Sequence, residues 1–258
     1  MKESKAVGVF GQHVVGLLLQ DERRENLNLV TTFVVSVSDI WFLVTAGHVL
    51  ANVQRDRSGE IKGRLIDSTG LEPQYGMAIP FDFDSASPII FGDDTSFDYA
   101  VIPLRPYYRS LLTKNGIVPL DERAWAKPPL NPDYYLLAGF PSELVDVPQT
   151  PQDWDDLVVC CTAHSLEQLP DAPHGFGEKT GPRAYFRIAL GSDLESILGL
   201  SGSPVFALSG NESALRYWLV GVQSSWVRSS RSIAVCPAQP LLGCLQDKIR
   251  QSPAGLSN

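Results

Sequence analysis

Residues 199–205 have the sequence Gly199-Leu200-Ser201-Gly202-Ser203-Pro204-Val205, with one serine held between two glycines. Glycine lets the backbone turn tightly and approach a bound molecule closely. A serine on such a turn can be exposed as a nucleophile while its own N–H points at a developing oxyanion. The same residues are compatible with an ordinary turn between two strands, so the rest of the chain has to decide.

The composition is that of a folded, acidic protein. The chain has 258 residues, of which 44% are hydrophobic and 19% are charged. This length fits one large all-β domain or two smaller ones. The formal net charge is -8, and no cluster of Lys and Arg offsets it. Because nucleic acid requires a basic face, we expect no nucleic-acid partner.

The cysteines and the apolar segments indicate a cytoplasmic protein. The apolar piece at 14–19 is too short for a secretory signal, and no stretch reaches the length of a membrane span, so we expect no membrane partner. Four cysteines do not make a disulfide framework in a chain this long. A secreted chain trimmed of its signal would have the same appearance.

Short β-branched and apolar runs predict an all-β fold. The clearest is a hairpin formed by 29–37 and 40–44, joined by a turn at Ser38-Asp39. Further strands are expected at 6–10, 14–19, 63–67, 76–80, 98–104, 134–138, 157–163, 184–190, 204–208 and 218–223. Loops are expected over 81–95, 142–155 and 165–182, with a short helical turn within 51–60.

The end of the chain predicts a helix, and the middle predicts a linker. Leu241, Leu242, Leu245 and Ile249 recur at helical spacing, with a proline in the first turn. Residues 119–133 are rich in proline and polar groups, which is typical of a connection between domains. We therefore expect an N-terminal domain over 1–118 and a C-terminal domain over 134–258.

His48 and Asp98 are candidate partners of the serine. Of the four histidines, His48 follows an expected strand in a Thr-Ala-Gly-His turn, although a histidine at a strand end is more often structural. Asp98 opens a buried strand further along the chain. Asp93 and Asp94 are its rivals, and Asp98 is preferred because the apolar strand follows it directly.

Four motifs in this order resemble those of the trypsin-like (chymotrypsin-fold) serine peptidases, of the bacterial intracellular type. Thr45-Ala46-Gly47-His48 resembles the histidine motif, and Asp98-Tyr99-Ala100-Val101-Ile102-Pro103-Leu104 resembles the aspartate motif. Gly199-Leu200-Ser201-Gly202-Ser203-Pro204 resembles the nucleophile motif, and Leu219-Val220-Gly221-Val222-Gln223-Ser224 the strand that follows. The order His, Asp, Ser differs from that of subtilisins and α/β-hydrolases.

The resemblance, which covers about 7–250, implies two six-stranded antiparallel β-barrels and a C-terminal helix. It implies a serine endopeptidase in which His48 is the general base, Asp98 orients it and Ser201 is the nucleophile. The N–H groups of Gly199 and Ser201 would form the oxyanion hole. It implies a protein or peptide substrate, an acyl-enzyme intermediate, and no metal or other cofactor. The alternative is a catalytically degenerate member of this fold that acts as a protein-binding or scaffold module.

Departures from the family pattern bear on regulation. Leu200 stands where many members carry an aspartate that pairs with a newly cut N-terminus, so activation by N-terminal cleavage is not expected. Val49 replaces a cysteine and Ser203 a glycine. A cytoplasmic peptidase without a zymogen switch needs another restraint. Substrate choice, a disordered site and an activating protein partner are the alternatives that the sequence leaves open.

Substrate-binding residues follow from the same resemblance. It places Glu195 at the base of the S1 pocket, where a carboxylate would favour a basic side chain. A solvated loop glutamate is the alternative. Ser224, Ser225 and Trp226 would form the wall of the groove, although Trp226 is as compatible with packing.

Two further patterns are weaker. Cys161-Thr162-Ala163-His164 has the spacing of half a zinc site, but no second pair accompanies it. Cys160 and Cys161 lack the glycine turn that a nucleophile would require.

Overall fold

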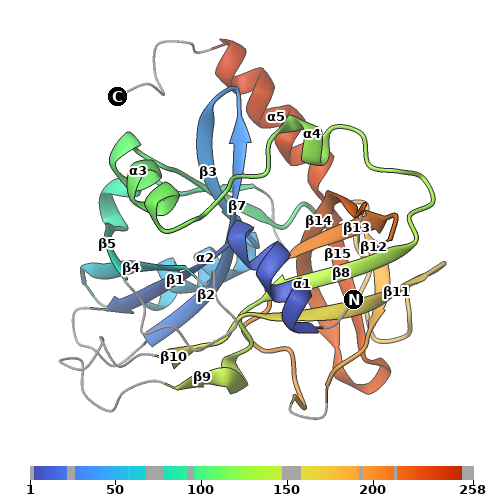
Figure 1. Cartoon of the computed structure of the whole chain (residues 1–258). Coiled ribbons are helices and arrows are strands. Elements are labelled where there is room, and N and C mark those ends of the chain that lie inside the picture. The colour runs from blue at the N-terminus through green and yellow to red at the C-terminus, as the bar shows by residue number, and fades with distance from the viewer. Residues whose placement is uncertain are drawn as a thin grey trace.

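The structure, a computed structural model, describes residues 3–21, 27–57, 59–67, 78–91, 96–146, 158–191, 194–211 and 214–251. Antiparallel strands dominate it, and they form two separate bodies, one from each half of the chain (Figure 1). The expected all-β fold is confirmed. The first half forms a seven-stranded sheet rather than the six strands expected, and the second half forms a closed six-stranded barrel.

The first sheet has the strand order β5-β4-β1-β2-β3-β7-β6. Its strands are β1 (Val14–Asp21), β2 (Leu27–Val37), β3 (Ile40–Thr45), β4 (Ile61–Asp67), β5 (Ile79–Asp82), β6 (Ile89–Phe91) and β7 (Tyr99–Pro103). The predicted β2–β3 hairpin is confirmed, with Val37 paired to Ile40. Ser38 and Asp39 both have positive φ, at 50° and 63°, the conformation that matches the twist of a two-residue hairpin.

The barrel has the strand order β11-β12-β15-β14-β13-β8. Its strands are β8 (Tyr134–Gly139), β11 (Thr162–Leu169), β12 (Ala184–Ile188), β13 (Pro204–Ser209), β14 (Arg216–Val227) and β15 (Ser232–Pro237). A small ribbon of β9 (Val145–Asp146) and β10 (Val158–Val159) lies outside it. The pairing of β14 with β15 shifts between Gln223 and Ser225, so Ser224 sits at an irregularity of the barrel wall.

The helices lie around the two β bodies. They are α1 (Glu3–Phe10), α2 (Gly47–Asp56), α3 (Pro106–Lys114), α4 (Glu122–Trp125) and the expected C-terminal helix α5 (Ala238–Gln251). Short 3-10 turns follow at η1 (Gly11–His13), η2 (Asp84–Ala86), η3 (Ser142–Leu144) and η5 (Arg228–Ser230).

The N-terminal strand prediction was wrong. Residues 6–10 belong to helix α1, in which Ala6, Val7 and Phe10 are buried while Lys5 and Gly8 are exposed. A short apolar run does not distinguish a strand from a buried helix face. The ring centroids of Phe10 and Phe206 lie 4.8 Å apart. Helix α1 therefore packs against the barrel, which the second half of the chain forms.

Other element boundaries in the structure also differ from those that the sequence predicted. Strand β6 lies within 81–95, and β11 continues to Leu169 inside 165–182, both of which were expected to be loops. Residues 76–77 and 157 of two expected strands, and the rivals Asp93 and Asp94, lie outside the described residues.

One apolar cluster joins the two bodies. It contains Phe33 and Val44 of the first sheet together with Ala138 and Phe206 of the barrel. Within the expected linker 119–133, Leu120 pairs with Val35 of β2. The division into domains at 118 and 134 stays a prediction.

His13 forms hydrogen bonds that connect the two bodies at the same junction. Its Nδ1 lies 2.6 Å from the Val118 carbonyl and its Nε2 lies 2.8 Å from the Tyr217 hydroxyl. Since a carbonyl only accepts, Nδ1 carries the hydrogen and Nε2 accepts from Tyr217. His13 is buried, and burial lowers its pKa against a smaller raising effect of the Val118 hydrogen bond.

We expect this histidine to make stability depend on pH. The folded His13 has a lowered pKa, whereas the unfolded side chain titrates at its ordinary value of about 6.5. The unfolded state therefore takes up the proton first, and the free energy of unfolding falls as pH drops from about 7.5 to about 5.5. Urea titrations over this range test it.

The comparison variant is His13→Gln, which removes the titrating group from this site. His164, whose pKa burial also lowers, remains and keeps part of the slope. The variant should therefore lose stability less steeply toward acid than the wild type. Equal slopes for the two proteins would contradict the assignment of this pH dependence to His13.

Candidate active site

The Thr-Ala-Gly-His segment joins β3 to α2 and brings Asp98 against the helix. A Cβ at Gly47 would lie 2.8 Å from the Tyr99 carbonyl oxygen and 3.2 Å from Asp98 Oδ1, so glycine permits this close approach. The backbone N–H of His48 donates to Asp98 Oδ1 at 2.8 Å. A first-turn helix N–H has no intrahelical acceptor, and this carboxylate supplies one.

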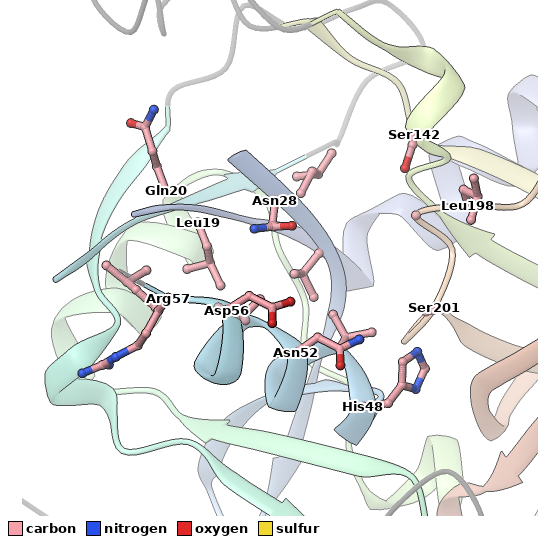
Figure 2. A pocket seen from close by; sticks show the side chains of 16 residues that line it. Leu19, Gln20, Asn28, His48, Asn52, Asp56, Arg57, Ser142, Leu198 and Ser201 are labelled. Atoms are coloured by element: carbon pink, nitrogen blue, oxygen red, sulfur yellow. The ribbon is translucent and has the colours of Figure 1, made fainter. Parts of the chain in front are cut away.

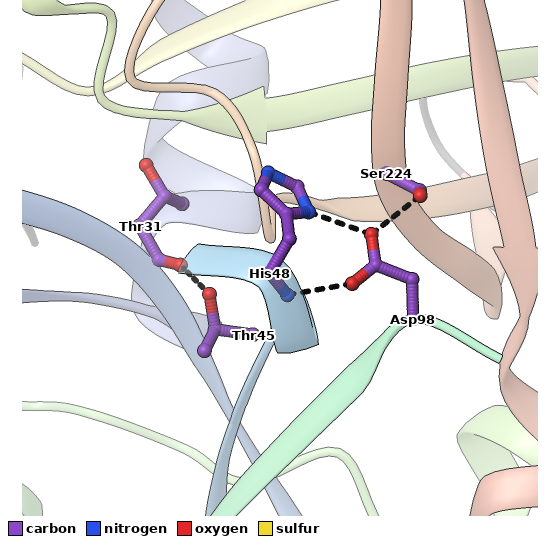
Figure 3. A network of polar contacts seen from close by, with 5 residues as sticks. All are labelled: Thr31, Thr45, His48, Asp98 and Ser224. Atoms are coloured by element: carbon purple, nitrogen blue, oxygen red, sulfur yellow. Dashed lines mark hydrogen bonds and ion pairs between the residues drawn. The ribbon is translucent and has the colours of Figure 1, made fainter. Parts of the chain in front are cut away.

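Asp98 is a buried carboxylate whose hydrogen bonds come from two parts of the chain. It is 0% exposed, and its Oδ2 accepts from His48 Nδ1 at 2.7 Å and from the Ser224 hydroxyl at 2.5 Å (Figure 3). Burial alone would raise the pKa of Asp98. The hydrogen bonds and charge of His48, with the Ser224 hydroxyl, outweigh burial and hold that pKa below its ordinary value.

These bonds define the state of the imidazole. Because the carboxylate accepts, Nδ1 of His48 carries a hydrogen, so in the neutral ring the lone pair is on Nε2. Nε2 lies on the side of the ring away from Asp98 (Figure 3). The His48 side chain is 30% exposed, so this basic nitrogen can meet a bound molecule.

Residues 199–203, called the serine loop below, contain two glycines at which any side chain would clash with neighbouring atoms. Gly199 and Gly202 have φ of 90° and 92°. A Cβ at Gly199 would lie 2.5 Å from Ser142 Oγ, and one at Gly202 would lie 2.0 Å from Thr45 Oγ1. Leu200 is 0% exposed and belongs to a core cluster of the barrel. Ser201 is thus presented by a loop packed on both sides.

A cavity of about 520 Å³ opens beside this loop. Figure 2 shows His48 and Ser201 at one end of it and Gln20 and Arg57 at the other. Its lining is Leu19, Gln20, Asn28, Leu29, Val30, His48, Val49, Asn52, Val53, Asp56, Arg57, Ile61, Ser142, Leu198, Gly199 and Ser201. The rim charges are paired, since Arg55 binds Asp56 and Arg57 binds Asp84, each at 2.9 Å.

The structure brings His48 into contact with Asp98 and places His48, Ser201 and Gly199 at one cavity, while their catalytic roles stay a prediction. His48 and Asp98 share two hydrogen bonds, and His48, Ser201 and Gly199 line one cavity. No hydrogen bond between described residues joins the Ser201 hydroxyl to His48. Such bonds are often long without substrate and shorten in the complex. Within the described chain, the N–H groups of Gly199 and Ser201 donate to no other residue.

None of the four expected substrate-binding residues, Glu195, Ser224, Ser225 and Trp226, lines this cavity. The Glu195 side chain is 87% exposed and faces Arg228 at 3.6 Å, so it is a surface carboxylate and not the enclosed base of a pocket. Ser224 does not line the cavity, because its hydroxyl is buried against Asp98. Trp226 packs against the barrel core, and its expected contact with substrate stays a prediction.

Sequence reasoning missed two contributors. Ser224 was expected in the groove, and its bond to Asp98 depends on the irregular pairing of β14. Thr31 was assigned only to a strand, yet its hydroxyl donates to the Gly199 carbonyl at 2.7 Å. Both contacts join residues far apart in sequence, so no local pattern signals them.

The described residues hold no group of His, Cys, Asp or Glu that is arranged for a metal ion. In the Cys161 to His164 segment, His164 Nε2 lies 2.8 Å from Thr162 Oγ1. Among the described helices, none is both long and apolar enough to cross a membrane.

Comparison by sequence finds no matching family model and no matching curated protein. Comparison by structure finds the Rv3671c protease of M. tuberculosis in its active form, at 17% identity and a TM-score of 0.50, over 94% of this chain and 83% of that one. The thermostable serine protease AL20 of an extremophilic microorganism matches at 14% identity and 0.52, over 92% and 98%.

The chain has the chymotrypsin fold. The expected resemblance to trypsin-like serine peptidases is therefore confirmed for the fold. An inactivated protease paralogue of the scabies mite matches as well, at 14% identity and a TM-score of 0.50, over 93% of this chain and 92% of that one. The chymotrypsin fold thus occurs with and without peptidase activity, and the fold alone does not assign a reaction.

The serine loop makes a stability prediction. Gly202→Ala forces a side chain into a left-handed backbone conformation and against Thr45, so we expect a loss of at least about 2 kcal/mol of unfolding free energy. Gly243→Ala is the matched control, because a Cβ at Gly243 in α5 meets nothing within 4 Å. That helical substitution should stabilise by up to about 1 kcal/mol. Urea unfolding measures both, and equal effects would contradict the packing described.

Proposed function

We propose that this protein is a serine endopeptidase that acts through His48, Asp98 and Ser201. The observation that carries the proposal is the hydrogen bond of buried Asp98 to His48, which places the Nδ1 hydrogen of the imidazole beside a cavity that Ser201 and Gly199 also line. A neutral imidazole oriented by a buried carboxylate is what activation of a serine hydroxyl requires.

The chemistry proceeds in two steps. Ser201 Oγ attacks the peptide carbonyl carbon while His48 Nε2 takes its proton, and the N–H groups of Gly199 and Ser201 bind the resulting oxyanion. The tetrahedral intermediate collapses to an acyl-enzyme, and His48 returns the proton to the leaving amine. Water then attacks the ester by the same route and releases the acid.

The direction of the substrate follows from these roles. His48 protonates the amine, so the peptide segment that leaves lies on the His48 side, along α2. The cavity extends in this direction, with apolar walls from Leu29, Val30 and Val53. We infer that it receives residues on the C-terminal side of the cleaved bond.

The cellular setting is part of this proposal. None of the cysteines Cys160, Cys161, Cys236 and Cys244 forms a disulfide bond, which fits a reducing compartment such as the cytoplasm. Control of the peptidase by an activating protein partner stays a prediction.

Labelling with a fluorophosphonate probe tests the proposed nucleophile. The probe should modify Ser201, as shown by mass spectrometry of the labelled peptide. Label should vanish in Ser201→Ala, and the labelling rate should fall by about 10⁴-fold in Asp98→Asn, because the wrong imidazole tautomer is then favoured. Label that persists in Ser201→Ala would overturn Ser201 as the nucleophile, whereas a wild type that is folded but inert would favour the binding-module alternative.

The cavity predicts selection on the amine side of the cleaved bond. In a peptide library we expect products whose new N-terminal residues are enriched in aliphatic and aromatic side chains, since apolar surface is buried there. Asn52→Lys and Asn52→Asp are a matched pair on the exposed rim. They should shift acceptance toward acidic and basic residues respectively. Identical libraries for both variants would contradict this orientation.

A further inference from the structure

Three consecutive peptide groups connect Leu198 to Ser201, and each has its carbonyl anchored. Leu198 O accepts from Ser142 N at 2.7 Å, Gly199 O from the Thr31 hydroxyl at 2.7 Å, and Leu200 O from Ser203 N at 3.0 Å. A trans peptide is planar, so its N–H points opposite to its C=O. The first and third anchors therefore aim the N–H groups of Gly199 and Ser201, the two proposed oxyanion donors.

The middle peptide has no conformational preference of its own to hold it. It begins at Gly199, and glycine populates positive and negative φ about equally. Two bonds restrain it: Leu200 N donates to Ile197 O at 3.0 Å, and Thr31 donates to Gly199 O. This peptide is joined through the α-carbons of Gly199 and Leu200 to the two peptides that carry the donor N–H groups, so its release leaves both of them less restrained.

Thr31 reaches the loop from the other body of the protein. It lies in β2, is 0% exposed, and its hydroxyl also accepts from Phe140 N at 3.1 Å. Its own carbonyl accepts from Thr45 Oγ1 at 2.8 Å, at the end of the strand that precedes His48. Ser142, Ser203 and Ile197, which make the other contacts, all follow the first sheet in the chain.

We propose that Thr31 is a positioning residue that aligns the oxyanion loop of the barrel with the His48–Asp98 pair of the first sheet. The effect of Thr31 on catalysis rests on the proposed function, whereas the hydrogen bond by which Thr31 holds the loop does not. Without the hydroxyl, the half-buried Gly199 carbonyl loses this donor and the buried Phe140 N loses its acceptor, which favours rearrangement of the loop.

The chain supplies a matched control in the next residue. Thr32 lies in the same strand, is also 0% exposed, and donates its hydroxyl to the Val15 carbonyl at 2.6 Å. That bond stays within the first sheet. Thr31→Val removes two hydrogen bonds of its hydroxyl, to Gly199 O and from Phe140 N, and Thr32→Val removes one, but only Thr31→Val releases the loop. Thr31→Ser keeps the hydroxyl and should behave as the wild type.

Hydrogen–deuterium exchange of the full chain tests the hold on the loop without any activity. In Thr31→Val the amides of 197–203, which include Leu200 and Ser203, should exchange at least about 10-fold faster than in the wild type and in Thr32→Val. Exchange in this segment that is unchanged, or raised equally in both variants, would overturn the proposal.

Kinetics test the consequence for catalysis. Thr31→Val should lower kcat and the fluorophosphonate labelling rate by about 10- to 100-fold with little change in KM, because misaimed donors act on the transition state. Thr31→Ser should restore both, and Thr32→Val should keep kcat. Faster exchange in Thr31→Val with unchanged kcat would overturn the link to the oxyanion donors. A wild type that hydrolyses nothing refutes the peptidase, and the exchange experiment still decides whether Thr31 holds the loop.

Discussion

The buried carboxylate of Asp98 is the group on which the site depends. A carboxylate at 0% exposure is strongly unfavourable unless donors replace water, and all three donors here are fixed by the fold. Two belong to His48 in α2 and one to Ser224 in β14. Because α2 connects β3 to β4 of the first sheet and β14 belongs to the barrel, the carboxylate is satisfied where the two bodies meet. Assembly of the site and docking of the bodies are therefore one event.

Further polar contacts between the bodies lie at the same junction. Thr31 bonds the Gly199 carbonyl, and His13 bonds both Val118 and Tyr217, in partly buried surroundings. Exposed ion pairs such as Arg187–Glu167 add little in comparison, since water screens them. The apolar cluster at this junction stabilises the contact between the two bodies, but hydrophobic burial is not directional. The hydroxyl, imidazole and carboxylate bonds fix the relative placement that apolar packing leaves open.

Local pattern predicted the parts of this protein whose causes are local. The β2–β3 hairpin follows from β-branched residues and its two-residue turn, and α5 from its apolar spacing. Helix α1 was missed because a five-residue apolar run fits either period. His48, Asp98 and Ser201 were proposed from motifs that follow one another in a fixed order, and their catalytic roles stay a prediction. Glu195 and Ser224 were misplaced because loop length and a strand irregularity decide where they point, and neither can be counted from sequence.

A small number of polar contacts, and not the fold alone, would decide whether this protein has the proposed activity. An inactivated scabies mite paralogue shares the architecture at a TM-score similar to that of an active protease. The core residues that maintain the barrels are therefore insufficient to define the chemistry. Three peptides beside Ser201, one of them starting at a glycine with φ of 90°, must be held in direction by hydrogen bonds. Packing around a mobile peptide tolerates rotation, whereas an oxyanion requires aimed donors. A protein can therefore keep this fold while its donor N–H groups lose the direction that an oxyanion requires.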